Sequence, residues 1–464
     1  MDVLLIRPFE QENINIRLPE SIYKVQGIFP PLGLSYIASV LKKNNIDVEI
    51  LDIPALNLTK AELNNLIAEK KPFLVGISCM STTLHSAYEV AKLAKENKAF
   101  VIIGGPHLAA YPKETLLHDF IDFGSIGEAE FIILELIHAL KKKKSHKSIK
   151  GLAYKEKGNI KINSYRIVHN LDSLPFPARN LLPMDKYDCV ITQKPFTTMM
   201  TSRGCPFQCG FCFKQPSDKR YRLRNVNNVI AEMQHCIEKY KVKEIMFYDD
   251  SFTFNKNFVI QLCNEIIKKK IKINWEAPTR VNNIDDNLLK LMKKAGCIRL
   301  RYGVESGNQR VLNLMKKGIT LEQVKRAFRI TKQNKIETFA YFMIGYATET
   351  EKTMNNTIDL AKKLNPDWVM FTATTPLPNT ELFDMAVKQN LVSKNYWRDY
   401  TLDKKTKRIP YFVKDADKWV QKAYRKFYLR PGFILNKIFS IRDIGTIKKY
   451  INGAKGIVLF NMQK

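Results

Sequence analysis

The segment SRGCPFQCGFCFK (202–214) decides how the fold of this chain is interpreted. It places Cys205, Cys209 and Cys212 in a CxxxCxxC spacing, after a β-forming run that begins near Phe196. Three thiolates at this spacing can hold one face of a cuboidal iron–sulfur cluster. A closed cluster or a structural zinc site takes four ligands. No fourth cysteine lies nearby, so one iron would keep an open position for a substrate or cofactor.

The residues after this segment predict a parallel barrel. Apolar and β-branched runs alternate there with helical segments, and the runs lie near residue 196 and at 244–250, 272–279, 298–306, 338–345 and 368–376. Six strands joined by right-handed crossovers predict a partial (β/α)6 barrel.

The residues before the cysteine segment predict a separate α/β domain. Buried-type strands at 2–7, 48–53, 73–79 and 99–105 alternate with helices at 31–44, 59–70 and 84–97. This alternation is typical of a doubly wound, Rossmann-like domain. No GxGxxG follows the first strand, which disfavours an ordinary dinucleotide site.

Composition shifts suggest where the domains end. The lysine run 141–144 closes the first domain, a hairpin turning at Gly158–Asn159 follows, and 171–179 is a proline-punctuated linker. We therefore expect a domain at 1–145, a hairpin and linker at 146–190, a barrel at 191–395 and a basic helical C-terminal extension at 396–464.

The charge balance is unusual for a globular chain of 464 residues. Lys and Arg number 75 against 45 Asp and Glu, for a net charge of +30. Such a field favours nucleic acid, an anionic membrane surface or an acidic ligand. The N-terminus lacks the features of a signal peptide, and no apolar run approaches the roughly 20 residues that span a bilayer. We expect a cytoplasmic protein with reduced thiols, in which Cys79, Cys189, Cys236, Cys263 and Cys297 are buried and bind nothing.

The string CPFQCGFC resembles the signature of the radical S-adenosylmethionine (SAM) enzymes, in which an aromatic residue, here Phe211, precedes the last cysteine. The resemblance implies a 4Fe–4S cluster on Cys205, Cys209 and Cys212. The open iron of that cluster would chelate SAM, and electron transfer would cleave SAM to a 5′-deoxyadenosyl radical. The SAM contacts implied in this way are Phe211, Tyr248, Asp249, Asp250, Arg280 and Glu305. FMIGYATET (342–350) and PLPNTEL (376–382) resemble further motifs of this group, with Ala347 in place of the usual Pro and Asn379 in place of Gly.

The N-terminal domain resembles that of the cobalamin-binding class of radical SAM enzymes. The segments that carry the likeness are 30–44, GISCMSTT (76–83), IGGPHLAAYPKE (103–114) and GEAE (127–130). The resemblance places cobalamin over the C-terminal ends of the strands, with contacts from Ser78, Thr82, Gly104, Gly105, His107, Gly127 and Glu128. The DxHxxG motif is absent, so His107 is not expected to bind cobalt. A degenerate domain that binds no corrin is the alternative.

By resemblance, we expect a cobalamin-dependent methyltransferase that acts on an unactivated carbon of a small-molecule or lipid substrate. A reductant such as flavodoxin or ferredoxin is expected as a partner, and nucleic acid is not. The alternatives are non-methylating chemistry, such as an oxidative cyclase or lipid or porphyrin tailoring, an RNA-modifying methylthiotransferase, and a non-catalytic cobalamin or light sensor. The intact cysteine motif argues against the sensor. The single cysteine of the N-terminal domain, Cys79, argues against the methylthiotransferase.

The C-terminal segment 423–451 interleaves cations with apolar side chains. The cations are Arg425, Lys426, Arg430, Lys437, Arg442, Lys448 and Lys449, and the apolar residues are Phe427, Tyr428, Phe433, Ile434, Leu435, Ile438 and Phe439. Pro431-Gly432 predicts a break between two helices. A basic amphipathic segment of this kind can lie on the inner membrane face. A cap docked on the barrel and an RNA-binding surface are the alternatives.

Overall fold

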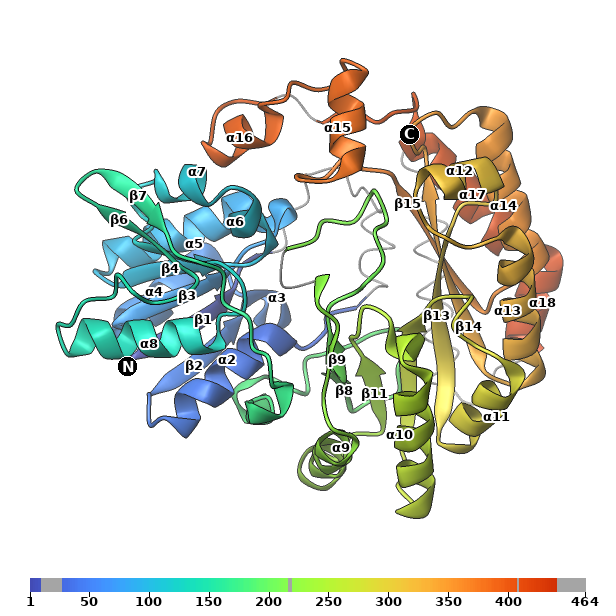
Figure 1. Cartoon of the computed structure of the whole chain (residues 1–464), viewed down its shortest axis with the longest axis horizontal. Helices are drawn as coiled ribbons and strands as arrows, with labels where there is room; N and C mark the ends of the chain where they lie inside the picture. Colours follow the sequence, from blue (N-terminus) through green and yellow to red (C-terminus); the bar gives the residue numbers. More distant parts are fainter. Residues whose placement is uncertain (10–26, 216–218, 407–408, 440–464) are drawn as a thin grey trace.

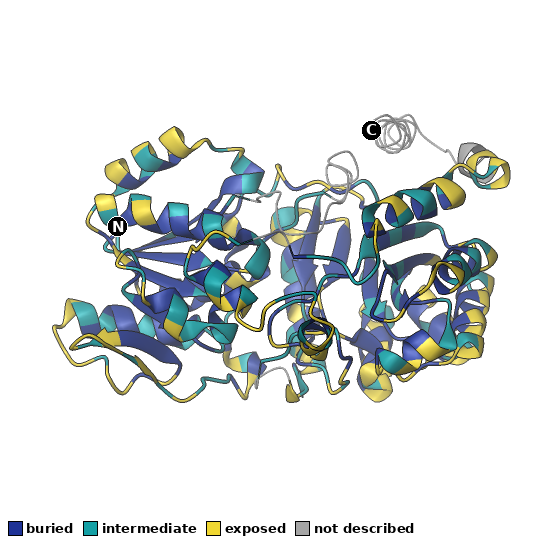
Figure 2. Cartoon of the chain, turned by 90° about the horizontal axis from the view of Figure 1, so that it is seen from above, coloured by how far each residue is buried: buried dark blue, intermediate teal, exposed yellow. Residues whose placement is uncertain are grey.

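The computed structural model describes residues 1–9, 27–215, 219–406 and 409–439. Two α/β units lie side by side, with the N-terminal unit on the left and the second unit on the right in Figure 1. In both units most strands are buried, and the outer faces of the helices are exposed (Figure 2). No helix within the described ranges is long and apolar enough to cross a membrane.

The N-terminal unit is built on a seven-stranded sheet of order β2-β1-β3-β4-β5-β6-β7. Its strands are β1 (Val3–Arg7), β2 (Val48–Asp52), β3 (Leu74–Ser78), β4 (Phe100–Gly104), β5 (Phe123–Ser125), β6 (Leu152–Glu156) and β7 (Asn159–Ile162). The first five are parallel, and β6 and β7 are antiparallel. The sheet therefore continues to Ile162, past the boundary expected at residue 145. The hairpin turns at Lys157–Gly158, one residue earlier than expected, and both residues have positive φ, as a two-residue hairpin turn requires.

Helices cover both faces of this sheet, which confirms the doubly wound fold. They are α2 (Leu32–Lys43), α3 (Ile53–Leu56), α4 (Lys60–Lys70), α5 (Leu84–Glu96), α6 (Pro106–Ala110), α7 (Pro112–Leu116) and α8 (Glu130–Lys141). Apolar residues of α2 and α8 form one core with one sheet face, and residues of α4 and α5 form another with the opposite face. The strand order changes direction between β1 and β3, and ligands of such sheets bind beyond the carboxyl ends at this point.

The second unit is a half-barrel of six parallel strands in the order β15-β14-β13-β12-β11-β8. These strands are β8 (Phe196–Met199), β11 (Glu244–Phe247), β12 (Asn274–Thr279), β13 (Cys297–Glu305), β14 (Glu337–Ile344) and β15 (Trp368–Ala373). The outer helices are α9 (Val226–Tyr240), α10 (Lys256–Lys268), α11 (Asp286–Lys294), α12 (Gln309–Leu314), α13 (Leu321–Gln333) and α14 (Glu351–Leu364). The six strands confirm the predicted partial barrel.

The chain after β15 does not form one extension. Residues 376–401, here called the bridging segment, contain α15 (Glu381–Lys388) and α16 (Tyr396–Thr401), drawn in orange at the top of Figure 1. Phe383, Trp397 and Tyr400 of this segment belong to a core of the N-terminal unit. The chain then returns as α17 (Ala416–Tyr428), which packs on β15 and α14, and α18 (Pro431–Phe439) is the last helix among the described residues.

Part of the predicted amphipathic tail is therefore barrel core. Phe427 is fully buried, and the Tyr428 hydroxyl donates to the Val369 carbonyl at 2.8 Å, so neither side chain can face a membrane. Two helices form as predicted, but the break between them lies at Leu429–Arg430, and Pro431-Gly432 begins α18. Arg442, Lys448 and Lys449 lie outside the described residues.

Candidate active site at the cysteine loop

The cysteine loop begins at the C-terminal end of β8, where a short ribbon fixes its root. β9 (Ser202–Arg203) pairs with β10 (Arg222–Leu223). The buried carboxylate of Asp249, which follows β11, accepts hydrogen bonds from the Thr201 backbone N–H and hydroxyl and from the Ser202 hydroxyl. Burial raises the pKa of Asp249, and these donors oppose that rise. Asp249, predicted as a SAM contact, holds the loop in place instead.

The three cysteines lie on this loop, and Cys209 and Cys212 flank a turn in which the Cys212 N–H donates to the Cys209 carbonyl at 3.1 Å. The Sγ atoms of Cys209 and Cys212 share a hydrogen bond, which, with the Lys317 and Arg280 cations nearby, lowers the pKa of Cys209 to about 5. Within the described ranges, no three Cys, His, Asp or Glu side chains are gathered tightly enough for a single metal ion. A cuboidal cluster suits this loop better, because its thiolates bind separate irons.

Two buried cations and one carboxylate lie beside the thiols. Arg280 Nη1 donates to Cys209 Sγ at 3.6 Å, and Nη2 donates to the Lys317 carbonyl. Lys317 Nζ lies 2.7 Å from Glu305 Oε1 and 5.8 Å from the centre of the Phe211 ring. A side chain at Gly303 would occupy this space, since its Cβ would lie 2.4 Å from Glu305 Oε1. The structure thus brings predicted residues Phe211, Arg280 and Glu305 to the cysteines.

The side chains of Arg280, Lys317 and Glu305 together carry the charges that the amino-acid end of SAM requires. Two cations suit a carboxylate and one carboxylate suits an ammonium group. Arg280 Nε is buried with no hydrogen-bond partner among the described residues. Glu305 has a φ of +68°, which is costly for a residue with a side chain and is typical of functional sites. The three cysteines therefore fit an iron–sulfur cluster, and the charged side chains beside them fit SAM.

The other two predicted SAM contacts lie elsewhere in the half-barrel. Tyr248 follows β11, is 45% exposed, and packs on Phe29 of the N-terminal unit with ring centres 6.3 Å apart. Arg301 lies on its other side, 5.8 Å from the ring centre. Tyr248 thus lies where the two units meet. Asp250 is exposed at the same end of β11.

The residues predicted to contact cobalamin include several at the carboxyl ends of β3 and β4, beside the end of β5. Ser78 and Gly104 end β3 and β4, and Thr82 lies in the short helix η1 (Ser81–Thr83) that follows. Ser125 ends β5, and its hydroxyl is buried without a hydrogen-bond partner among the described residues. An unpaired buried hydroxyl here fits the polar tail of a nucleotide cofactor. Gly105 has another role, because a Cβ there would lie 2.3 Å from the Cys79 carbonyl oxygen.

His107, predicted to contact cobalamin, lies in a buried hydrogen-bond network. The side chain is fully buried, with Nδ1 3.0 Å from the Ser81 hydroxyl and Nε2 2.9 Å from the Thr401 hydroxyl of α16. Burial lowers the pKa of His107 to about 3, so the ring is neutral. Both ring nitrogens therefore have a hydroxyl partner within the protein.

Gly127 and Glu128, also predicted to contact cobalamin, make close contacts within the protein. A Cβ at Gly127 would lie 2.3 Å from the Arg166 carbonyl oxygen. Glu128 accepts hydrogen bonds from Arg203 at 3.0 Å and from Arg222 at 2.7 and 2.9 Å. Burial raises the pKa of Glu128, but the Arg222 hydrogen bond and the Arg203 charge outweigh it, so the pKa lies below its usual value. Glu128 joins the N-terminal unit to the root of the cysteine loop.

Sequence reasoning missed several residues around the cysteines. No recognisable motif marks Lys317, which follows α12 and the turn at Met315–Lys316. Glu349 of FMIGYATET accepts from the Gly345 and Tyr346 backbone N–H groups, which explains the acidic residue of that motif. Asn379, which stands in place of the usual Gly, has a φ of +54°, a left-handed conformation that Asn tolerates.

Both units of the chain are similar to known protein families. A family model described as the Radical SAM superfamily matches residues 199–361, and one described as the B12 binding domain matches residues 22–137. An uncharacterized methyltransferase from Pyrococcus horikoshii is 38% identical, covering 91% of this chain and 93% of its own. The anaerobic magnesium-protoporphyrin IX monomethyl ester cyclase of Rubrivivax gelatinosus is 28% identical over 89% of this chain and 76% of its own.

The fold has a solved counterpart. The radical S-adenosylmethionine methyltransferase TsrM of Kitasatospora setae, with cobalamin and a [4Fe-4S] cluster bound, superposes with a TM-score of 0.74. The alignment covers 99% of this chain and 100% of that chain at 16% identity, a likeness of fold alone. Together with the cysteine loop and the P. horikoshii relative, these matches show that the chain belongs to the radical SAM enzymes that carry a B12-binding domain.

Proposed function

We propose that this protein is a cobalamin-dependent radical SAM methyltransferase that methylates an unactivated carbon of a small-molecule or lipid substrate. One observation carries the proposal: loops at the carboxyl ends of both sheets meet at the cysteine loop. Arg203, which precedes Cys205, pairs with Glu128 and Glu130 beyond β5. Tyr248 meets Phe29 across the same boundary. A substrate held there would face both cofactor sites.

The chain's own residues have distinct tasks in this proposal. Cys205, Cys209 and Cys212 would hold the cluster, which supplies reductive activation of SAM, and cobalamin would supply the methyl group. Arg280 and Lys317 bind and orient a carboxylate, and Glu305 binds an ammonium or hydroxyl group. Ser78, Thr82, Gly104 and Ser125 line the strand ends where the nucleotide tail of cobalamin would lie. The buried contacts between the units exclude water from reactive species.

Product analysis tests this proposal against its main rival. The full chain would be reconstituted anaerobically with iron, sulfide and methylcobalamin and supplied with substrate, SAM and a reductant. A methyltransferase should form S-adenosylhomocysteine and 5′-deoxyadenosine in equal amounts, because SAM is used both as methyl donor and as radical source. The 28% identical cyclase makes oxidative cyclisation the second candidate. Formation of 5′-deoxyadenosine without matching S-adenosylhomocysteine would favour that candidate.

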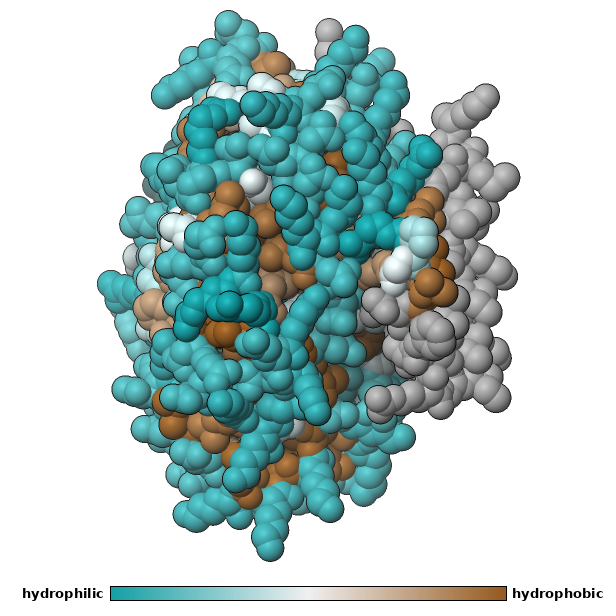
Figure 3. Space-filling model, turned by 90° about the vertical axis from the view of Figure 1, so that its right-hand side faces the viewer, coloured by the Kyte–Doolittle hydropathy of each residue, from teal (hydrophilic) through white to brown (hydrophobic). Residues whose placement is uncertain are grey.

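We also propose a cytoplasmic setting, a reductant of the flavodoxin or ferredoxin kind, and contact with the inner membrane face. Leu429, Ile434 and Leu435 are 47%, 42% and 52% exposed around the start of α18, next to the exposed cations Arg425 and Lys426. Apolar patches lie between hydrophilic side chains on this helical side of the half-barrel (Figure 3). This combination favours an anionic bilayer surface.

Flotation with anionic liposomes at low salt tests the membrane contact. The full chain should float, and Leu429→Ser/Ile434→Ser/Leu435→Ser should float markedly less. Truncation at residue 400 is unsuitable, because it would remove the buried side of α17 from the barrel core. Equal flotation of the triple variant and the wild type would contradict the proposed contact.

A further inference from the structure

A line of side-chain contacts runs from the protein surface to the cysteine loop. Phe254, in the short helix η5 (Phe252–Phe254), is 39% exposed, and its ring meets the Phe207 ring edge-on with centres 5.7 Å apart. The Arg280 guanidinium lies 3.8 Å from the centre of the Phe207 ring. Arg280 in turn donates to Cys209 Sγ. Each step is a direct contact, so the loop is connected to the outside through aromatic and guanidinium groups.

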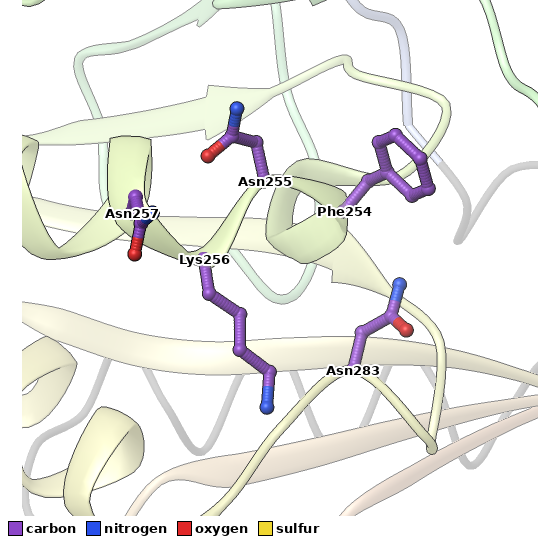
Figure 4. A pocket seen from close by; sticks show the side chains of 5 residues that line it. All are labelled: Phe254, Asn255, Lys256, Asn257 and Asn283. Carbon is purple, nitrogen blue, oxygen red and sulfur yellow. The ribbon is translucent and has the colours of Figure 1, made fainter.

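The surface around Phe254 is polar and basic. Phe254 borders a shallow pocket with Asn255, Lys256, Asn257 and Asn283 (Figure 4). The only charge in this lining, Lys256, is paired with Asp285 at 3.1 Å.

The basic charge comes from the segment beside this pocket. The exposed residues Lys219 and Arg220 precede Tyr221, whose ring packs on Phe254 with centres 4.7 Å apart. In sequence, residues 214–222 hold four cations and one acidic residue. An exposed aromatic ring beside a chain segment rich in cations can serve as a protein interface.

We propose that the surface formed by Phe254, Lys219 and Arg220, the Phe254 face, is where an acidic one-electron carrier protein docks. This inference rests on the proposed function, which needs an electron from outside for each radical event. In the docked complex one electron leaves the reduced cofactor of the carrier and enters the cluster, so the carrier is oxidised and the cluster reduced by one electron each. Charge complementarity selects the partner, because Lys219 and Arg220 attract an acidic surface while Phe254 supplies apolar contact.

The test compares two electron donors on the same reconstituted full chain. Stopped-flow bleaching of the cluster absorbance gives the reduction rate with reduced flavodoxin, an acidic carrier, and the rate with dithionite, a small ion. The measured quantity is the ratio of the two rates. In Lys219→Glu/Arg220→Glu this ratio should fall about tenfold, the low end of the effect of electrostatic steering on association. The wild-type ratio should also fall as salt is added.

A charge-matched control separates docking from overall charge. Lys142→Glu/Lys144→Glu makes the same charge change beyond α8, at exposed positions of the N-terminal unit, and should leave the ratio within about twofold of wild type. If Lys219→Glu/Arg220→Glu loses its iron, the neutral variant Lys219→Gln/Arg220→Gln is measured in its place. Its ratio of reduction rates should fall about threefold, because electrostatic steering is weaker.

Two results would have different meanings. A Phe254-face variant whose ratio equals that of the control would overturn the docking site while leaving the proposed function intact. Failure of the wild-type chain to hold a cluster or cleave SAM with dithionite would instead overturn the proposed function.

Discussion

Replacing Arg203 by Met should weaken the junction between the two units. Arg203 is 14% exposed and donates to Glu130 at 2.6 Å and to Glu128 at 3.0 Å, and these carboxylates are 5% and 11% exposed. Glu128 would keep its ion pair with Arg222. The carboxylate left without a partner is therefore Glu130, whose second oxygen already has no hydrogen-bond partner among the described residues. Removing one partner of a buried ion pair costs about 3–5 kcal/mol, and we expect the low end, about 3 kcal/mol, because Glu128 remains paired.

A double-mutant cycle measures this interaction directly. Glu130→Gln removes the charge that Arg203→Met leaves unpaired, so the double variant should be more stable than the sum of the single losses predicts, by about 1–3 kcal/mol. Urea unfolding followed by tryptophan fluorescence gives the free energies of unfolding. As a matched control, Arg166→Met breaks the pair with Glu135, which is 43% exposed, and should cost less than about 1 kcal/mol. The reasoning would be refuted if the losses of unfolding free energy in the two single variants simply added in the double variant. It would also be refuted if Arg203→Met lost no more unfolding free energy than Arg166→Met.

Three further predictions concern the site and its surroundings. Cys209→Ala should retain almost no iron or sulfide after reconstitution while its circular dichroism matches wild type, and full iron retention would exclude a cluster at this loop. Lys317→Met leaves Glu305 buried and unpaired, and should raise the Kd for SAM about tenfold or more by anaerobic calorimetry; an unchanged Kd would remove Lys317 from the SAM site. The folded-state pKa of His107 lies near 3, below its ordinary 6.5, so the stability it contributes is complete above pH 6.5 and is lost at about 1.4 kcal/mol per pH unit as the pH falls toward 3. Unfolding of His107→Gln should lack this slope, and a slope equal to wild type would contradict the assignment.

The sequence predicted the strands well because their signal is local. Each barrel strand lies within a few residues of its expected position, since apolar alternation and the following helix mark it without reference to the rest of the chain. The cysteine loop could be predicted equally well, because its three ligands are close in sequence and their spacing can be read directly. These features depend on residues that are neighbours in sequence.

The errors concern side chains whose partners are distant in sequence. Asp249 binds Thr201 and Ser202, and His107 binds Thr401, 294 residues away. Glu128 pairs with Arg203 and Arg222 of the other unit. A motif that recurs in a family marks such a residue as important but does not say whether it touches a cofactor or holds another loop.

The bridging segment means that the two units cannot be exchanged as independent modules. Its α15 end touches the cysteine loop, where the Leu382 N–H donates to the Gly210 carbonyl at 3.0 Å. Its α16 end is fixed to the N-terminal unit through Thr401, whose carbonyl oxygen accepts from Tyr88 and His118 at 2.8 Å each. A chimaera that joins this half-barrel to a foreign cobalamin domain at the linker would therefore leave Trp397 and Tyr400 without their pocket. Residues 376–401 would have to be transplanted together with the N-terminal unit, as a discontinuous piece of the same graft.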